Sequence, residues 1–206
     1  MKARIAAALL LGLCGAAPAA AQGDISLYGT YASTAFAATD SFEAVAGTAR
    51  HPGFGGGILA SRLWRGAFLD VGLFQTKIDG ERVFLNGTSV YTLGIPLQVK
   101  ITPVDLAAGW RLTNGRLSSF LGAGVSSVAY SETGAFSEDG DNVSLRKSGP
   151  LVLAGVDAGI TKWVRVGGEV RYRAVKGILG SGGISGAYGE NQLGGISGAL
   201  RVSVGR

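Results

Sequence analysis

The feature that most constrains this chain is a strict alternation of apolar and charged residues over positions 164–174. One parity carries Val164, Val166, Gly168, Val170, Tyr172 and Ala174, and the other carries Arg165, Gly167, Glu169, Arg171 and Arg173. Successive side chains of a β-strand point to opposite faces, so this strand has one apolar face and one charged face. A soluble sheet turns its apolar face to a core, whereas a transmembrane barrel turns that face to lipid.

The first 21 residues have the layout of a secretory signal. Lys2 and Arg4 precede an apolar stretch from Ile5 to Leu13, and Ala19-Ala20-Ala21 precede Gln22. A basic start, a short apolar stretch and a small-residue cleavage site are typical of a signal peptide. We therefore expect residues 1–21 to be removed and residues 22–206 to form one domain. The single cysteine, Cys14, lies in the leader, so no disulfide is expected in the domain.

The composition favours the membrane alternative. Charged residues make up 16% of the chain, against about 25% in a typical soluble domain, and the mean hydropathy is +0.30. After the leader, no apolar run reaches the ~20 residues that a transmembrane helix needs. The formal net charge of +5 includes two leader charges, and the remaining basic residues are dispersed. The sequence therefore predicts a membrane barrel and no nucleic-acid partner.

Alternating segments divide the domain into eight expected strands. We expect them at 25–35, 54–63, 67–77, 91–112, 117–130, 151–160, 164–175 and 195–204. The connections at 64–66, 113–116 and 161–163 are short, whereas those around Ser41, Asp79, Glu138 and Gly182 are longer. Short periplasmic turns alternating with long outer loops are typical of bacterial outer-membrane barrels. The predicted fold is all-β, an eight-stranded antiparallel up-and-down transmembrane β-barrel.

The fourth expected strand changes phase within itself. Apolar residues occupy odd positions from Tyr91 to Ile101 and even positions from Val104 to Leu112, so the phase slips at Thr102-Pro103. The slip is explained either by one bulged strand or by a turn between two strands. One strand keeps all short turns at one end of the barrel, so we expect one bulged strand. Upstream, Asp79-Gly80 and Asn86-Gly87 are hairpin-type turn pairs that predict a protruding hairpin around residues 81–85.

Three segments resemble those of the small eight-stranded outer-membrane barrels, the broad OmpW-like, OmpA-barrel and opacity-type grouping. Residues 102–112 (TPVDLAAGWRL) are similar to the strand before a periplasmic turn, residues 120–125 (FLGAGV) to a family strand opening, and residues 168–173 (GEVRYR) to the charged penultimate strand. The resemblance covers the domain in layout and only these segments in residues. It implies a barrel that lies among outer-membrane lipid and lipopolysaccharide and is inserted by the barrel-assembly machinery.

The positions opposite the apolar parity predict a charged lumen. Side chains nearly fill the interior of an eight-stranded barrel, so buried charges there are expected to pair. The structural interpretation is a salt-bridge core, and the functional alternative is a gated polar path for small solutes. The predicted lumen charge network comprises Asp70, Asp105, Arg111, Asp157, Glu169, Arg171, Arg173 and Arg201.

Catalytic and metal-binding alternatives have weaker support. His51 is the only histidine, and Ser41 and Glu43 lie in the same expected loop, but no spacing rule joins them into a catalytic triad. Residues 138–142 (EDGDN) offer oxygen ligands for a divalent cation without the twelve-residue calcium-loop pattern. We therefore predict no catalytic residue, no metal site and no cofactor.

The sequence predicts a non-enzymatic outer-membrane barrel with a structural or surface role. Two alternatives remain open. The first is a narrow channel for small or hydrophobic solutes, which the OmpW resemblance implies. The second is a surface adhesion module that acts through the outer loops, because loops on a rigid scaffold often carry function. The sequence identifies no partner for those loops.

Overall fold

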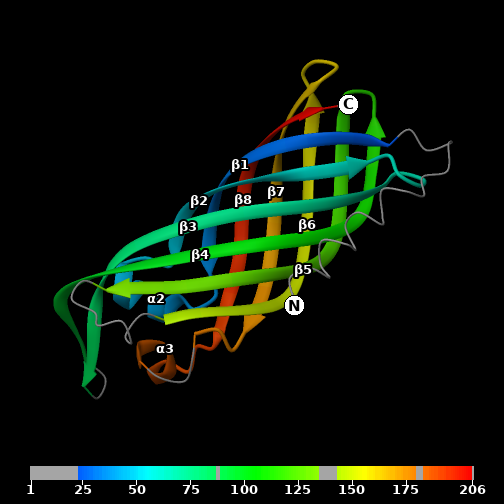
Figure 1. Ribbon diagram of the computed structural model, residues 1–206. Helices are drawn as coiled ribbons and strands as arrows, with labels where there is room; N and C mark the ends of the chain where they lie inside the picture. The colour runs from blue at the N-terminus through cyan, green and yellow to red at the C-terminus, as the bar shows by residue number, and fades with distance from the viewer. Residues whose placement is uncertain (1–22, 87–88, 135–142, 180–182, 206) are drawn as a thin grey trace, which may run out of the picture.

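The structure is a computed structural model that describes residues 23–86, 89–134, 143–179 and 183–205. Its strands form one closed antiparallel barrel in which each strand pairs with the next and β8 pairs with β1 (Figure 1). The expected leader, residues 1–21, lies outside the described residues. The elements are β1 (Asp24–Phe36), α2 (Thr39–Ala46), β2 (Arg50–Ser61), β3 (Ala67–Asn86), β4 (Ser89–Asn114), β5 (Leu117–Gly134), β6 (Val143–Gly159), β7 (Val164–Lys176), α3 (Gly183–Ala187) and β8 (Gln192–Gly205).

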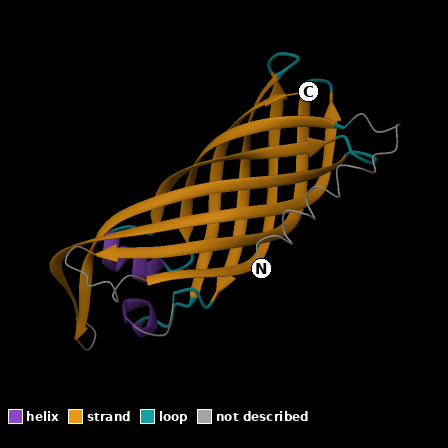
Figure 2. Cartoon of the chain, in the orientation of Figure 1, coloured by secondary structure: helices purple, strands orange, loops and turns teal. Residues whose placement is uncertain are grey.

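The predicted fold class and strand number are confirmed, and so is the predicted sidedness of the connections. The short connections at 62–66, 115–116 and 160–163 lie at one end of the barrel, called here the turn end. Both helices lie at the opposite end, called here the loop end (Figure 2). In the described part of the chain, no helix has the length and hydropathy needed to cross a membrane.

All eight strands extend further toward the loop end than predicted, β3 and β6 by the most. Asp79-Gly80 is not a turn, because Asp79 pairs with Gln98 and Gly80 with Leu97 inside the β3–β4 ladder. The Asp79 carboxylate also accepts a hydrogen bond from Gln98 Nε2 at 3.0 Å. The side chain that suggested a turn therefore links β3 to β4. The protruding hairpin is present, since β3 and β4 remain paired as far as Asn86 and Ser89. Gly87, the other half of the second predicted turn pair, lies outside the described residues.

The expected bulge at Thr102-Pro103 is wrong, although the single strand is correct. The β4–β5 register runs without a shift from Ile101 to Val104. A register shift occurs instead in the β3–β4 pairing, nearer the loop end, where Glu81 pairs with Pro96 but Val83 pairs with Thr92. The apolar phase changes because the apolar side chains change sides of the wall. Val104 and the even positions after it face outward, whereas Leu97, Val99 and Ile101 are buried inside. Along this regular strand, the apolar residues therefore face outward near the turn end and inward near the loop end.

An apolar cluster beneath the helices fills the loop end of the barrel. It contains Phe36 and Phe42, whose rings stack with centroids 4.7 Å apart, together with inward residues of β3, β4, β5, β7 and β8. Sequence patterning did not predict α2, which was expected to be part of a loop. Its N-cap residue, Ala38, offers no side-chain cap. Glu190 supplies one instead, accepting hydrogen bonds from Asp40 N at 3.1 Å and Ser41 N at 2.8 Å.

Candidate functional site

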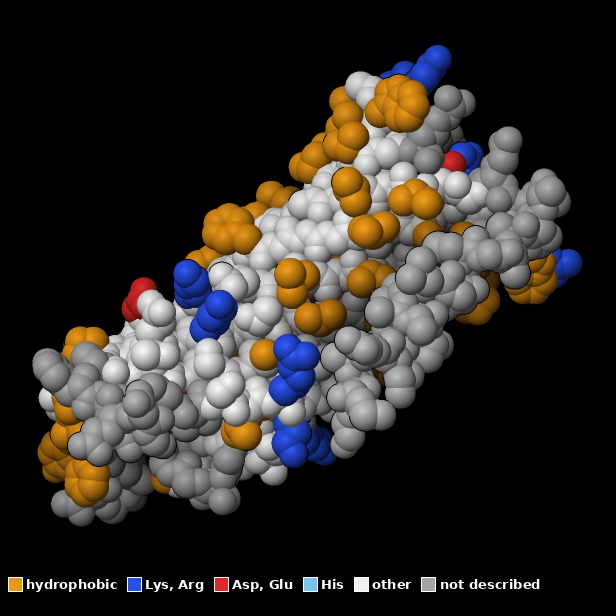
Figure 3. All heavy atoms as spheres, viewed as in Figure 1, with side chains coloured by type: hydrophobic (Ala, Val, Ile, Leu, Met, Phe, Trp, Pro, Cys, Tyr) orange, Lys and Arg blue, Asp and Glu red, His pale blue; other side chains and the backbone are white. Residues whose placement is uncertain are grey.

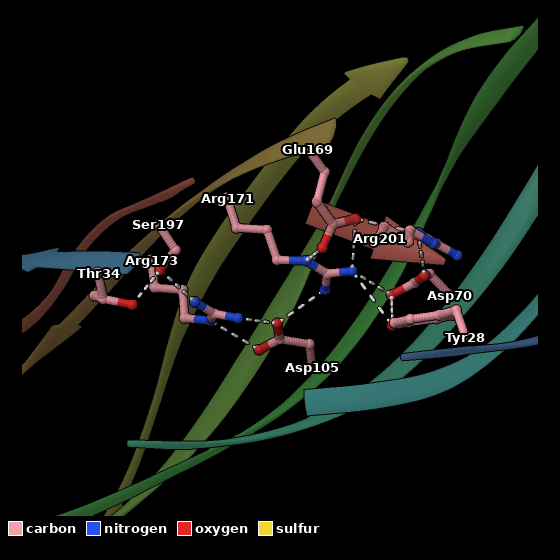
Figure 4. Close-up of polar contacts among 9 residues, drawn as sticks. All are labelled: Tyr28, Thr34, Asp70, Asp105, Glu169, Arg171, Arg173, Ser197 and Arg201. Atoms are coloured by element: carbon pink, nitrogen blue, oxygen red, sulfur yellow. Dashed lines mark hydrogen bonds and ion pairs between the residues drawn. The ribbon is translucent and has the colours of Figure 1, made fainter. Parts of the chain in front are cut away.

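The candidate site is the middle of the barrel lumen, where charged side chains from β3, β4, β7 and β8 meet. The structure places all eight residues of the predicted charge network on inward positions, and the seven other than Arg111 are buried as whole residues. The side chain of Arg111 itself is only 7% exposed. Alternation positions them, because each is flanked on its strand by residues that face outward. Six of the eight form one connected group around Arg171 (Figure 4).

Arg171 is the hub of this group. Its guanidinium donates hydrogen bonds to three carboxylates, with Nε 2.8 Å from Glu169 Oε1, Nη1 3.0 Å from Asp105 Oδ2 and Nη2 3.1 Å from Asp70 Oδ1. These carboxylates come from β7, β4 and β3, so one side chain joins three walls of the barrel. Charge-assisted hydrogen bonds of this kind are about twice as strong as neutral ones.

Two further arginines neutralise the same three acids. Arg173 Nη2 donates to Asp105 Oδ2 at 2.6 Å, and its Nη1 donates to Ser197 Oγ at 3.1 Å. Arg201 Nη1 lies 3.1 Å from Glu169 Oε2 and 3.5 Å from Asp70 Oδ2. Three arginines therefore face three carboxylates, and this central layer is balanced in charge.

Aromatic side chains that were not among the predicted site residues complete the central layer. The guanidiniums of Arg171 and Arg173 lie 4.7 Å and 4.9 Å from the ring centroid of Phe74, and that of Arg201 lies 3.7 Å from the ring of Tyr28. Tyr28 also donates a hydrogen bond to Asp70 Oδ1 at 3.0 Å. A cation over an aromatic face is stabilised further when it is shielded from water. The alternation of the sequence could have identified Tyr28 and Phe74, since both occupy inward positions on their strands.

A second charged layer lies nearer the turn end and contains an arginine missing from the predicted network. Asp157 forms ion pairs with both Arg111 and Arg165. Arg165 Nη2 also donates to Ser118 Oγ at 2.6 Å. Arg165 stands on the charged parity of residues 164–174, so that alternation already contained the signal. With Arg165 included, the two charged layers contain five arginines and four carboxylates.

The lumen between the central layer and the apolar cluster is nearly filled. A cavity of about 30 Å³ lies there, bordered by Arg171, Arg173, Phe74 and Ile101. That volume is about what one water molecule occupies in the liquid. The arrangement can hold the barrel walls together and obstruct the lumen, and it leaves little space for a substrate.

The structure does not bring the alternative catalytic residues together. Ser41 Oγ donates to Glu190 Oε2 at 2.6 Å, whereas His51 Nε2 lies 2.7 Å from the carbonyl oxygen of Thr48. Glu43 is exposed. His51 is also not a loop residue, because β2 begins at Arg50 and the His51 side chain packs near Phe36 and Phe42. Across residues 23–86, 89–134, 143–179 and 183–205, no cluster of three or more His, Cys, Asp or Glu side chains could hold a metal ion. Residues 138–142, the alternative cation-binding segment, lie outside those ranges.

The outer wall carries a continuous apolar belt. On every strand the outward positions nearer the turn end are occupied mainly by exposed apolar residues, separated by glycine, alanine and an occasional serine. Aromatic residues flank the belt on both sides, with Trp64, Trp110 and Trp163 toward the turn end and Tyr31, Phe54 and Tyr172 toward the loop end. Figure 3 shows apolar side chains spread over the visible wall.

Cations follow the belt toward the loop end. This set, called here the cation collar, consists of exposed residues on five strands, and Figure 3 shows several Lys and Arg side chains on that half of the visible face. Lys77 and Lys100 are direct cross-strand partners, although like charges in that arrangement repel. The members of the collar are Arg50, Lys77, Lys100, Arg146 and Lys176.

Comparison with known proteins supports the fold alone. No family model matches the chain, and no curated protein sequence matches it. Among solved structures, the chain is similar to neisserial surface protein A (TM-score 0.52, 16% identity, covering 88% of this chain and 96% of that one). It is also similar to a major outer membrane protein of Thermus thermophilus (0.52, 11%, 88% and 99%). A third similar structure is Ail, the attachment invasion locus protein of Yersinia pestis, in complex with the heparin analogue sucrose octasulfate (0.51, 14%, 89% and 97%). The chain thus has the fold of the small eight-stranded outer-membrane barrels.

Proposed function

We propose that this chain is a non-enzymatic barrel of the bacterial outer membrane, with a structural or surface role. The observation that carries the proposal is the inversion of its two sides, with an apolar belt outside and buried ion pairs inside. That distribution is unstable in water and stable in a bilayer. The aromatic residues flanking the belt add support, because aromatic girdles at both interfaces are typical of such barrels.

The two ends then have defined sides. Short turns are periplasmic in bacterial outer-membrane barrels, and long connections are extracellular. The turn end would therefore face the periplasm and the loop end the outside, after export through the expected leader and insertion by the barrel-assembly machinery. The cation collar would lie at the level of the outer-leaflet headgroups, where phosphates of lipopolysaccharide can neutralise Lys77 and Lys100.

Fractionation of cells and one substitution test the membrane location. Leu106 is 53% exposed and lies in the belt on β4. An arginine on the lipid face costs about 2–4 kcal/mol near the bilayer midplane, so Leu106→Arg should reduce folding into lipid vesicles. Glu43→Arg, at an exposed position of α2, is the control and should fold normally. Recovery of the wild-type protein in the soluble periplasmic extract would reject the proposal.

A structural role is favoured over conduction. The side chains of Arg171, Phe74 and Tyr28 occupy the central lumen, and the adjoining cavity has room for about one water molecule. We therefore expect no discrete openings in planar bilayers. Reproducible single-channel steps would instead support the narrow channel. The separate hydrogen bonds of Ser41 and His51 support the proposal that the barrel is not an enzyme.

A surface-binding role is the second candidate, and the folded loop end favours it. Glu190 holds α2 against the fourth outer connection, so the loop end presents ordered helices. Ordered loops on a rigid scaffold are common binding sites. The similar protein Ail was solved with a heparin analogue, so a sulfated polysaccharide is a reasonable first probe. Attachment of cells expressing the wild type to heparin-coated surfaces, compared with a variant lacking residues 135–142, tests this candidate.

A further inference from the structure

The turn end contains a second chamber, distinct from the central layer. This chamber, called here the vestibule, has a volume of about 100 Å³ and is bordered by Arg62, Arg111, Arg165 and Asp24 and by several hydroxyl groups. The volume is about that of three water molecules. It is therefore large enough for a small oxyanion with four oxygens.

The vestibule carries an excess of positive charge. Arg62 pairs with Asp24 at the rim, but Asp157 is shared by Arg111 and Arg165. The central layer cannot compensate, because its three carboxylates already face three arginines. One positive charge is therefore left over among side chains that are only partly solvated, since the Arg111 side chain is 7% exposed, that of Asp157 4% and that of Arg165 30%. A poorly solvated charge without a counterion is unfavourable.

Unused hydrogen-bond donors surround that charge. Among the residues that the structure describes, Arg111 makes a single side-chain hydrogen bond, to Asp157, although a guanidinium has five N–H donors. Ser61 and Ser203 border the same chamber, and within the described residues neither hydroxyl has a side-chain partner. These donors come from β4, β2 and β8, so they converge from different parts of the wall.

We propose that the vestibule binds a small oxyanion, with phosphate as its representative. Arg111 and Arg165 would supply the charge, and the serine hydroxyls would donate to oxygens that the guanidiniums do not reach. Arginine forks suit oxyanions because they offer parallel donors in a plane. The proposal requires only the barrel, so it stands or falls independently of the proposed surface role.

Arg165→Gln is the decisive variant. It removes the excess charge and leaves the Arg111–Asp157 ion pair intact, so the barrel should still fold. Lys162→Gln is the control, because Lys162 is an exposed cation at the same end that does not border the vestibule. Ser203→Ala tests the hydroxyl contribution without any change in charge.

Binding is measured with the full chain, refolded in neutral detergent, by calorimetric titration with inorganic phosphate and by the phosphate-dependent rise in unfolding temperature. Sodium chloride at equal ionic strength is the comparison salt. We expect phosphate to bind the wild type and Lys162→Gln equally, and to bind Arg165→Gln at least about tenfold more weakly, the loss of one charge-assisted hydrogen bond. We expect a smaller loss in Ser203→Ala. Equal binding by Arg165→Gln, equal effects of chloride, or no phosphate effect on the wild type would each overturn the proposal.

Discussion

Arg171 Nη1 lies 3.0 Å from Asp105 Oδ2, and this ion pair joins β7 to β4, which are not neighbours in the barrel. Backbone hydrogen bonds connect only adjacent strands, so contacts through the lumen are what hold opposite walls at a fixed separation. Both side chains are almost completely buried, at 2% and 0% exposure. The pair is therefore shielded from salt and coupled to every other contact of the Arg171 guanidinium.

Replacing Arg171 should destabilise the barrel strongly. Arg171→Met leaves Asp70, Asp105 and Glu169 buried with only two arginines, and breaking a buried pair from one side costs about 3–5 kcal/mol. The measurement is urea unfolding in detergent or lipid, followed by tryptophan fluorescence. Arg116→Met, at an exposed position in the turn end, is the matched control and should stay within about 0.5 kcal/mol of the wild type.

A double variant tests whether the contributions of Arg171 and Asp105 to the free energy of unfolding depend on each other. Arg171→Met with Asp105→Asn removes both charges, so its loss should be smaller than the sum of the two single losses. Strictly additive losses would show that the two side chains act independently, in contradiction to the observed contact.

Removing the Glu190 carboxylate should loosen α2. Glu190 accepts hydrogen bonds from the first-turn amides of Asp40 and Ser41, which Ala38 leaves uncapped. Loss of a cap costs about 1 kcal/mol, so amide exchange at those residues should accelerate about fivefold in Glu190→Ala. Glu43→Ala, within the same helix, should leave their exchange unchanged. Hydrogen exchange read by mass spectrometry or NMR distinguishes the two outcomes.

Much of the fold could be predicted because alternation is a local property of the sequence. The belt residues and the inward charges share strands, so the parity of Val170 also fixes the parity of Glu169 and Arg171. The same reasoning failed at Thr102-Pro103. Parity reports which residues share a face, but it does not report whether that face meets lipid or a second apolar core inside the barrel. Only the position along the barrel axis decides this, and sequence spacing does not contain it.

The sequence predicts that charges pair within the lumen, but it does not predict which residues pair with which. Alternation placed Arg171 inside, but its choice of Asp70, Asp105 and Glu169 depends on the stagger of β3, β4 and β7 around the ring. Similarly, the cap that Glu190 provides for α2 joins residues about 150 positions apart. No short motif marks such a contact. The long strand extensions were missed because Asp79-Gly80 has turn chemistry that the ladder overrides.

Gly124 marks a position where two strands approach too closely for a side chain. A Cβ added there would lie 1.9 Å from the Leu106 carbonyl oxygen and 2.6 Å from the Ala107 Cα, so the backbone of β4 would have to move. Gly124→Ala should therefore cost about 1–3 kcal/mol, the usual range for overpacking. Gly29→Ala is the matched control, because nothing lies within 4 Å of its added Cβ. Equal urea midpoints for the two variants would contradict this account.

Tyr130 lies on β5 beyond the belt residue Val125, on the loop side. Burial raises the pKa of its phenol well above the ordinary value of 10.0, and the Glu132 carboxylate that accepts its hydrogen bond raises that pKa further. Because the folded-state pKa is the higher one, this contribution to stability is complete below pH 10 and is lost as the pH rises beyond it. The phenol should therefore stay protonated at pH 11, where exposed tyrosines ionise. Absorbance at 295 nm should rise between pH 9 and 11 by the same amount in the wild type and in Tyr130→Phe. A rise smaller by one tyrosine in the variant would show that Tyr130 titrates normally and that its contact with Glu132 does not persist in solution.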